Sequence, residues 1–104
     1  MTRLEIDMSV RMLLFASIDA EKEKEFEAAF LVVRERVATV PGHERDQLMR
    51  QHDEPGAYVL ISDWNTREQF QRWLKSDQHD QMTEEMRPYF SRPSEMRFYQ
   101  VRES

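Results

Sequence analysis

Two short segments, residues 10–18 and 57–64, carry apolar side chains at both odd and even positions, and this feature most constrains the fold. Both segments are rich in β-branched and aromatic residues and lack glycine and proline, which is typical of buried strands. Successive side chains of a strand point to opposite faces, so such strands need cover on both faces of their sheet. The sequence therefore predicts a sheet with two apolar faces.

A helix is expected between these strands, over residues 20–38. Asp19 is its expected N-cap, and Pro41-Gly42 ends it. Apolar side chains recur along it at the spacing of one helix face: Phe26, Ala29, Phe30, Val33 and Val37.

A second helix is expected to begin after Thr66, which forms a capping box with Gln69. Its apolar stripe consists of Phe70, Trp73 and Leu74. The stripe is interrupted at Ser76 or Asp77 and resumes with Met82, Met86 and Phe90, so the helix should be bent and in two pieces.

The remaining segments complete a βαββαβ order. Residues 43–52 and 57–64 form a hairpin around the turn Asp53-Glu54-Pro55-Gly56, and residues 95–102 form the last strand. This order is typical of an α+β, ferredoxin-like domain with a four-stranded antiparallel sheet, here a single domain over residues 1–104. Two helices can cover only one face of that sheet. We therefore expect a homodimer in which a second copy covers the other face.

Composition and charge exclude several classes of protein. The 104 residues include no cysteine, so disulfide scaffolds and thiolate chemistry are excluded. Fifteen basic against twenty acidic residues give a net charge of -5, which disfavours nucleic acid as a partner. The longest apolar run, Met12 to Ala16, is too short to span a membrane, and the first seven residues lack the pattern of a signal peptide. We expect a cytoplasmic protein without a membrane partner.

Few residues are candidates for chemistry. His79 is the most usable acid or base, because an imidazole titrates near neutrality, although a histidine on the surface of a helix is the plainer interpretation. Trp73 is either a core residue or the wall of a pocket for a flat substrate, and Trp64 has the same two interpretations. His43 looks like a loop or strand-start residue, and His52 like a turn residue. Since the histidines do not have metal-ligand spacing, we expect no metal.

Several motifs together resemble the antibiotic biosynthesis monooxygenase family. They are Val40-Pro41-Gly42-His43, Asp53-Glu54-Pro55-Gly56, Tyr58 to Trp64 and Phe70 to Ser76. The resemblance implies a dimeric α+β barrel of ferredoxin-like subunits, each with an apolar pocket between its sheet and its helices. Family members include oxygenases that convert aromatic polyketides to quinones without metal or flavin, and haem-degrading monooxygenases.

The resemblance also assigns positions. In the haem-degrading branch, an asparagine falls at Leu14, a tryptophan at Trp73, and a histidine at Thr83, or at Met82 if the loop is shorter. In the quinone-forming branch, an asparagine falls at Leu60, a tryptophan at Trp64, and an aromatic hydroxyl at Phe70. This chain thus lacks the polar side chains of both branches. It is expected to use Leu14, Leu60, Trp64, Phe70 and Met82 as substrate contacts.

The resulting prediction is a small monooxygenase that acts on an apolar aromatic or polycyclic substrate, with His79 and Trp73 as catalytic residues and no cofactor. Two alternatives remain open. One is a cyclase or isomerase of a biosynthetic pathway that uses the same pocket. The other is a non-catalytic dimer that binds a small ligand or haem.

Overall fold

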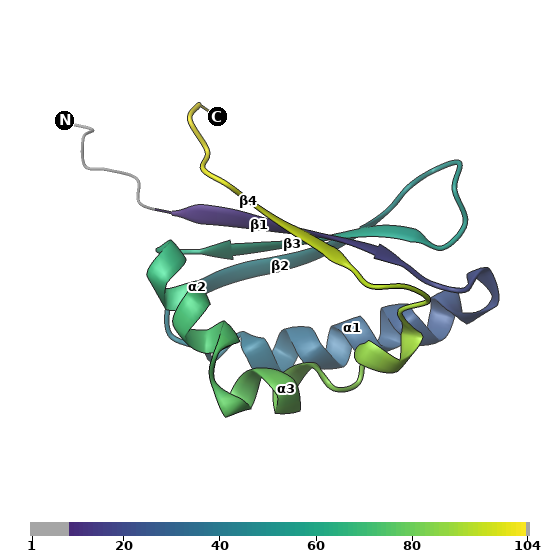
Figure 1. The fold of residues 1–104 in the computed structure, drawn as a ribbon, viewed down its shortest axis with the longest axis horizontal. Helices are drawn as coiled ribbons and strands as arrows, with labels where there is room; N and C mark the ends of the chain where they lie inside the picture. The colour runs from purple at the N-terminus through teal and green to yellow at the C-terminus, as the bar shows by residue number, and fades with distance from the viewer. Residues whose placement is uncertain (1–8, 104) are drawn as a thin grey trace.

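The computed structural model describes residues 9–103 and confirms the α+β, ferredoxin-like fold (Figure 1). Residues 1–8 and 104 lie outside the described part, and with them the segment on which the signal-peptide expectation depends. The elements are β1 (Val10–Ser17), η1 (Ala20–Lys22), α1 (Glu23–Val37), β2 (His43–Arg50), β3 (Ala57–Trp64), α2 (Arg67–Leu74), α3 (Asp77–Thr83), η2 (Arg87–Tyr89) and β4 (Glu95–Tyr99).

The four strands form one antiparallel sheet in the order β2-β3-β1-β4. The helices lie together against one face of this sheet (Figure 1). Leu14 pairs with Leu60 on that face, and the neighbouring pair Leu13 and Ile61 therefore points to the opposite face. No helix of residues 9–103 covers this outer face (Figure 1). The predicted sheet with two apolar faces, of which the helices cover only one, is thus confirmed.

Helix α1 buries the five apolar side chains predicted from the sequence. Its beginning differs from the prediction. The chain first forms the short 3₁₀ helix η1, in which the Asp19 carbonyl accepts a hydrogen bond from the N–H of Lys22 at 2.9 Å, and the Asp19 side chain caps nothing. The expected Asp19 cap was therefore wrong, because a local turn satisfies the backbone there instead.

Both glycines of the chain have left-handed backbone angles, with φ of 91° at Gly42 and 79° at Gly56. At Gly56 a side chain would also collide with the main chain, because a Cβ would lie 1.9 Å from the carbonyl oxygen of Ile18. This close approach allows the N–H of Ile18 to donate to the carbonyl of Gly56 at 2.8 Å. The hairpin turn is therefore attached to the end of β1.

The second helical segment is in two pieces, as predicted. The hydroxyl oxygen of Thr66 accepts a hydrogen bond from the N–H of Gln69 at 3.1 Å, which caps α2. Ser76 ends α2, because its N–H and its hydroxyl both donate to the carbonyl of Trp73. The chain then turns and begins α3 at Asp77. This break places His79 beside Trp73.

Two further observations complete the fold. Strand β4 ends at Tyr99, so it is shorter than the predicted 95–102, and Ile18 pairs with Phe90 in an isolated bridge. Across residues 9–103, no helix has the length and apolar character needed to cross a membrane.

Candidate functional site

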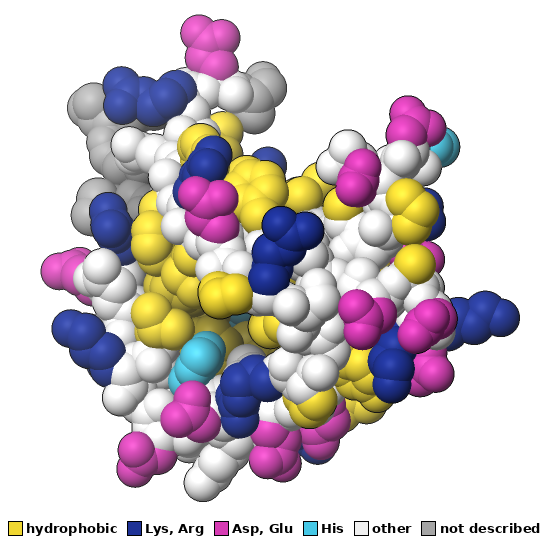
Figure 2. All heavy atoms as spheres, turned by 45° about the vertical axis from the view of Figure 1, so that its right-hand side comes forward, with side chains coloured by type: hydrophobic (Ala, Val, Ile, Leu, Met, Phe, Trp, Pro, Cys, Tyr) yellow, Lys and Arg dark blue, Asp and Glu magenta, His cyan; other side chains and the backbone are white. Residues whose placement is uncertain are grey.

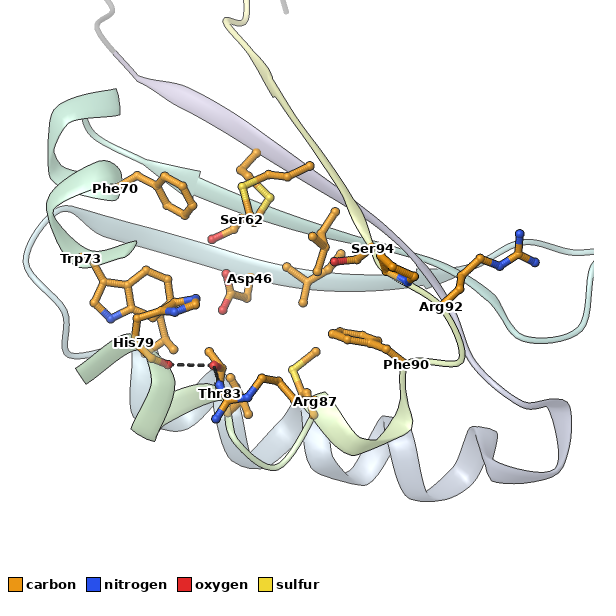
Figure 3. A pocket seen from close by; sticks show the side chains of 18 residues that line it. Asp46, Ser62, Phe70, Trp73, His79, Thr83, Arg87, Phe90, Arg92 and Ser94 are labelled. Atoms are coloured by element: carbon orange, nitrogen blue, oxygen red, sulfur yellow. Dashed lines mark hydrogen bonds between the residues drawn. The ribbon is translucent and has the colours of Figure 1, made fainter. Parts of the chain in front are cut away.

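A cavity of about 660 Å³ lies between the inner face of the sheet and the helices (Figure 3). Figure 2 shows hydrophobic side chains in a hollow of the surface, with a histidine and basic side chains beside it. Most of the lining is apolar, and this part consists of Met12, Leu14, Val33, Val37, Leu60, Phe70, Trp73, Met86, Phe90, Pro93 and Met96. A site of this size and character suits a flat apolar ligand.

An aromatic cluster forms one end of the cavity. The rings of Trp64 and Trp73 stack with centroids 5.2 Å apart and planes at 29°, and Phe70 meets Trp64 edge-on at 5.3 Å. Trp73 and Phe70 line the cavity, whereas Trp64 is fully buried behind them. The indole N–H of Trp64 donates to the Ser62 hydroxyl oxygen at 2.8 Å. Trp64 therefore supports the wall without being part of it.

His79 projects from α3 beside Trp73, and the two rings meet edge to face with centroids 4.8 Å apart (Figure 3). Burial lowers the pKa of His79 below its ordinary value of 6.5, and this effect outweighs the opposing hydrogen bond to Asp80. The Asp80 carboxylate lies 3.5 Å from Nδ1. A neutral imidazole in an apolar wall can accept a proton from a bound ligand.

Polar contacts fix the segment that follows His79. The hydroxyl of Thr83 donates to the carbonyl of His79 at 2.7 Å and accepts from Nη1 of Arg87 at 2.8 Å. Arg87 and Arg92 both line the cavity, and the Arg87 guanidinium lies on the side of His79, beside Thr83 and Asp80, whereas Arg92 lies at the end remote from Trp73 (Figure 3).

On the sheet side, the cavity wall contains a buried carboxylate, Asp46. Its Oδ1 lies 2.9 Å from Nε2 of His43, and the side chains of His43 and Asp46 are only 3% and 6% exposed. In a regular strand, residues three apart point to opposite faces. Here a bulge between His43 and Arg45 adds a residue to β2, so His43 and Asp46 point to the same face.

The residues predicted for the site are only partly brought together. His79, Trp73, Leu14, Leu60 and Phe70 line the cavity. Trp64 lies behind the wall, and Met82 packs against the core outside the lining. His52 is exposed in the hairpin turn, away from the cavity.

The polar side chains of the wall were missed from the sequence, above all Asp46, Ser62 and Arg87. One signal was present for Asp46, because it stands two residues before Leu48 and so shares the face of an apolar residue in the expected strand. His43 starts β2, as the sequence indicated, and its ring packs edge-on against Trp64 at 5.1 Å, a contact that the sequence did not predict.

The cavity does not match the haem site that the resemblance suggests. The position of the axial histidine is held by Thr83, whose hydroxyl is occupied by His79 and Arg87. The asparagine position is held by Leu14. Within residues 9–103, no three histidine or acidic side chains lie close enough together to hold a metal ion.

Fold and cavity together define a class: a small ferredoxin-like α+β domain with an apolar ligand site between sheet and helices. A family profile described as antibiotic biosynthesis monooxygenase matches residues 9–85. The chain belongs to this family.

Curated relatives come from Streptomyces. The chain is 32% identical over 95 residues to protein SchA of Streptomyces halstedii, a match that covers 91% of this chain and 25% of SchA. It is 37% identical over 70 residues to a 42.8 kDa protein in the whiE locus of Streptomyces coelicolor, covering 67% of this chain and 18% of that protein. The chain thus spans a quarter or less of the length of these relatives.

Solved structures share the fold at low sequence identity. SnoaB, a cofactor-independent oxygenase from Streptomyces nogalater, superposes with a TM-score of 0.78 at 23% identity, covering 92% of this chain and 95% of SnoaB. A putative antibiotic biosynthesis monooxygenase from Bordetella bronchiseptica gives a TM-score of 0.83 at 19% identity, covering 89% and 96% of the two chains. These likenesses confirm the fold.

Proposed function

We propose that this chain is a monooxygenase that acts without metal or flavin on an apolar aromatic or polycyclic substrate. The observation that carries the proposal is the apolar cavity, in which Trp73 forms a flat wall and His79 lies beside it. Family membership and the fold shared with a cofactor-independent oxygenase support it.

In the proposed reaction, the substrate itself supplies the electrons. His79 takes a proton from an acidic C–H or O–H group, and the electron pair stays on the ring system as a carbanion or enolate. This electron-rich anion reacts with oxygen. A methylene group becomes a carbonyl, one oxygen atom enters the product and the other leaves as water. Trp73 and Phe70 hold the ring plane, and Leu14 and Leu60 exclude water from it.

We further propose that the working unit is a homodimer. The outer face of the sheet presents Leu13, Phe15 and Val59, which are partly exposed around the buried Ile61, and Met49 beside them is 46% exposed. Apolar side chains gathered on an open sheet face are typical of an interface, and a second copy would present the same surface.

Anthrone tests the reaction. Incubated with the wild-type protein in air, it should give anthraquinone with consumption of one oxygen molecule, faster than with heat-denatured protein. The same incubation without oxygen should leave anthrone unchanged, whereas a cyclase or isomerase would act on its substrate regardless of oxygen. Failure of the wild-type protein to accelerate quinone formation would contradict the proposal.

The role of His79 is tested by His79→Ala. Loss of a general base should lower kcat for anthrone oxidation about 100-fold or more. The matched control is His52→Ala, which makes the same change in the exposed hairpin turn and should leave kcat unchanged. Equal rates for the two variants would remove His79 as the base.

A further inference from the structure

We propose that Asp46 is the polar group that selects the substrate, by accepting a hydrogen bond from a hydroxyl on its aromatic ring, and that His43 is the residue that positions it. The substrate class narrows accordingly to hydroxylated aromatic compounds. This inference rests on the proposed function insofar as it takes the cavity as the substrate site.

The burial of Asp46 is the first argument. An ionised carboxylate removed from water is unfavourable unless it is paired or hydrogen-bonded. The Asp46 side chain is 6% exposed, and its Oδ1 is hydrogen-bonded to His43. Within residues 9–103, no hydrogen bond or ion pair occupies Oδ2. Because Asp46 lines the cavity and Oδ2 is not among the buried unpaired atoms of the described residues, this oxygen is accessible to a molecule in the cavity and can accept a hydrogen bond from it.

The direction of Asp46 is the second argument. Asp46 lines the cavity, and so does Ser62, which stands directly opposite it on β3 (Figure 3). The Ser62 hydroxyl oxygen accepts from the indole of Trp64, so its own hydrogen remains available as a donor. An acceptor and a donor therefore stand side by side on a wall that is otherwise apolar. A ring system with a hydroxyl close to a carbonyl satisfies both.

The local backbone is the third argument. The bulge in β2 brings His43 onto the same face as Asp46, and the His43 ring is held edge-on against Trp64. His43, on the same strand, thereby fixes the position of Asp46. The aromatic cluster in turn fixes the position of His43. Bulges often redirect side chains beside functional sites.

The test compares two probes of similar size, 2-naphthol and 2-methoxynaphthalene, of which only the first can donate a hydrogen bond. Isothermal titration calorimetry of the wild-type protein should show tighter binding of 2-naphthol, by about tenfold or more. In Asp46→Leu, which has no hydrogen-bond acceptor, this preference should fall to near one. The matched control, Asp63→Leu, makes the same change on the outer face and should keep the preference.

His43→Phe retains the ring against Trp64 but removes the hydrogen bond to Asp46, so the preference should decrease without disappearing. A merely structural role would weaken the binding of both probes equally and leave their ratio unchanged. Retention of the preference in Asp46→Leu, or its loss in His79→Ala instead, would overturn the inference.

A measurement on the wild-type protein covers the case in which Asp46→Leu does not fold. Bound 2-naphthol should absorb at longer wavelength than in an apolar solvent, because its hydroxyl donates to a carboxylate. An unshifted spectrum, or equal binding of the two probes, would overturn the inference. Anthrone oxidation separates the two proposals: quinone formation with no probe preference contradicts only the role of Asp46, and probe preference without quinone formation contradicts only the oxygenase.

Discussion

The two faces of the sheet each carry an aspartate, and the two residues have different surroundings. Asp63 on the outer face lies between two arginines, with Arg11 at 2.8 Å and Arg45 at 3.1 Å, and its side chain is 16% exposed. Among the described residues, Asp46 on the inner face is paired only with His43, at 2.9 Å. The outer carboxylate is compensated by the chain itself, whereas the inner one retains an oxygen for a ligand.

The apolar side chains of the two faces differ in the same way. On the inner face, Leu14 and Leu60 meet helices and a cavity, and the chain completes their surroundings except for the ligand. On the outer face, Phe15 meets the guanidinium of Arg97 at 5.2 Å, and no helix of residues 9–103 covers it. The inner face is therefore suited to a small molecule and the outer face to a protein surface.

The largest effect is expected from a charge placed on the outer face, which should weaken the proposed dimer. In Val59→Asp, the proposed dimer would have to bury an unpaired carboxylate, so its dissociation constant should rise about 100-fold or more. Sedimentation velocity at micromolar concentration measures the change.

The control is Leu31→Asp, which places the same charge on the exposed side of α1, where Leu31 is 51% exposed. This variant should sediment as the wild-type protein does. A wild-type protein that is monomeric at micromolar concentration would contradict the homodimer itself.

A smaller effect, on the free energy of unfolding, is expected from Ser62→Ala on the inner face of the sheet. The substitution leaves the buried indole N–H of Trp64 without its acceptor, which should lower the free energy of unfolding by about 1–3 kcal/mol. Urea denaturation followed by tryptophan fluorescence measures this change. The comparison variant is Ser91→Ala, which removes an exposed hydroxyl that donates to the carbonyl of Ser17. If Ser62→Ala were no less stable than Ser91→Ala, the inner-face hydrogen bond would not contribute as we infer.

The smallest effect concerns pH. Because burial lowers the pKa of His79 in the folded state, the unfolded chain binds the proton more readily. Stability should therefore be lost as the pH falls below 6.5, the ordinary value, toward the folded-state pKa. Urea denaturation at pH 7.5 and pH 5.5 measures the difference, and His79→Gln should reduce it. An identical pH dependence in His79→Gln would show that other groups determine it.

Much of the fold could be predicted, because local patterns determine it. The five buried residues of α1 follow from helical periodicity, and the Thr66 cap follows from the spacing of two polar residues. The expected cap by the Asp19 side chain does not form. A backbone turn takes its place there, and such a turn leaves no pattern in the sequence.

The site was less predictable. Leu14, Leu60, Phe70 and Trp73 were named from the resemblance, and they line the cavity. Asp46 was not predicted as a site residue, because its pairing with His43 depends on a bulge. Strict alternation along the strand would place His43 on the opposite face. Trp64 was expected in the wall, but Trp73 stacks over it and separates it from the cavity. This stacking depends on how a helix packs on a strand, which the sequence does not show.

The sequence by itself determined the order of the elements, the apolar faces of the strands and the family. These depend on periodicity and on residues close together along the chain. Only the tertiary structure decided which polar side chains enter the cavity. A charged group is buried or exposed according to what packs around it, and for Asp46 those neighbours are set by a backbone irregularity and by an aromatic cluster drawn from three elements.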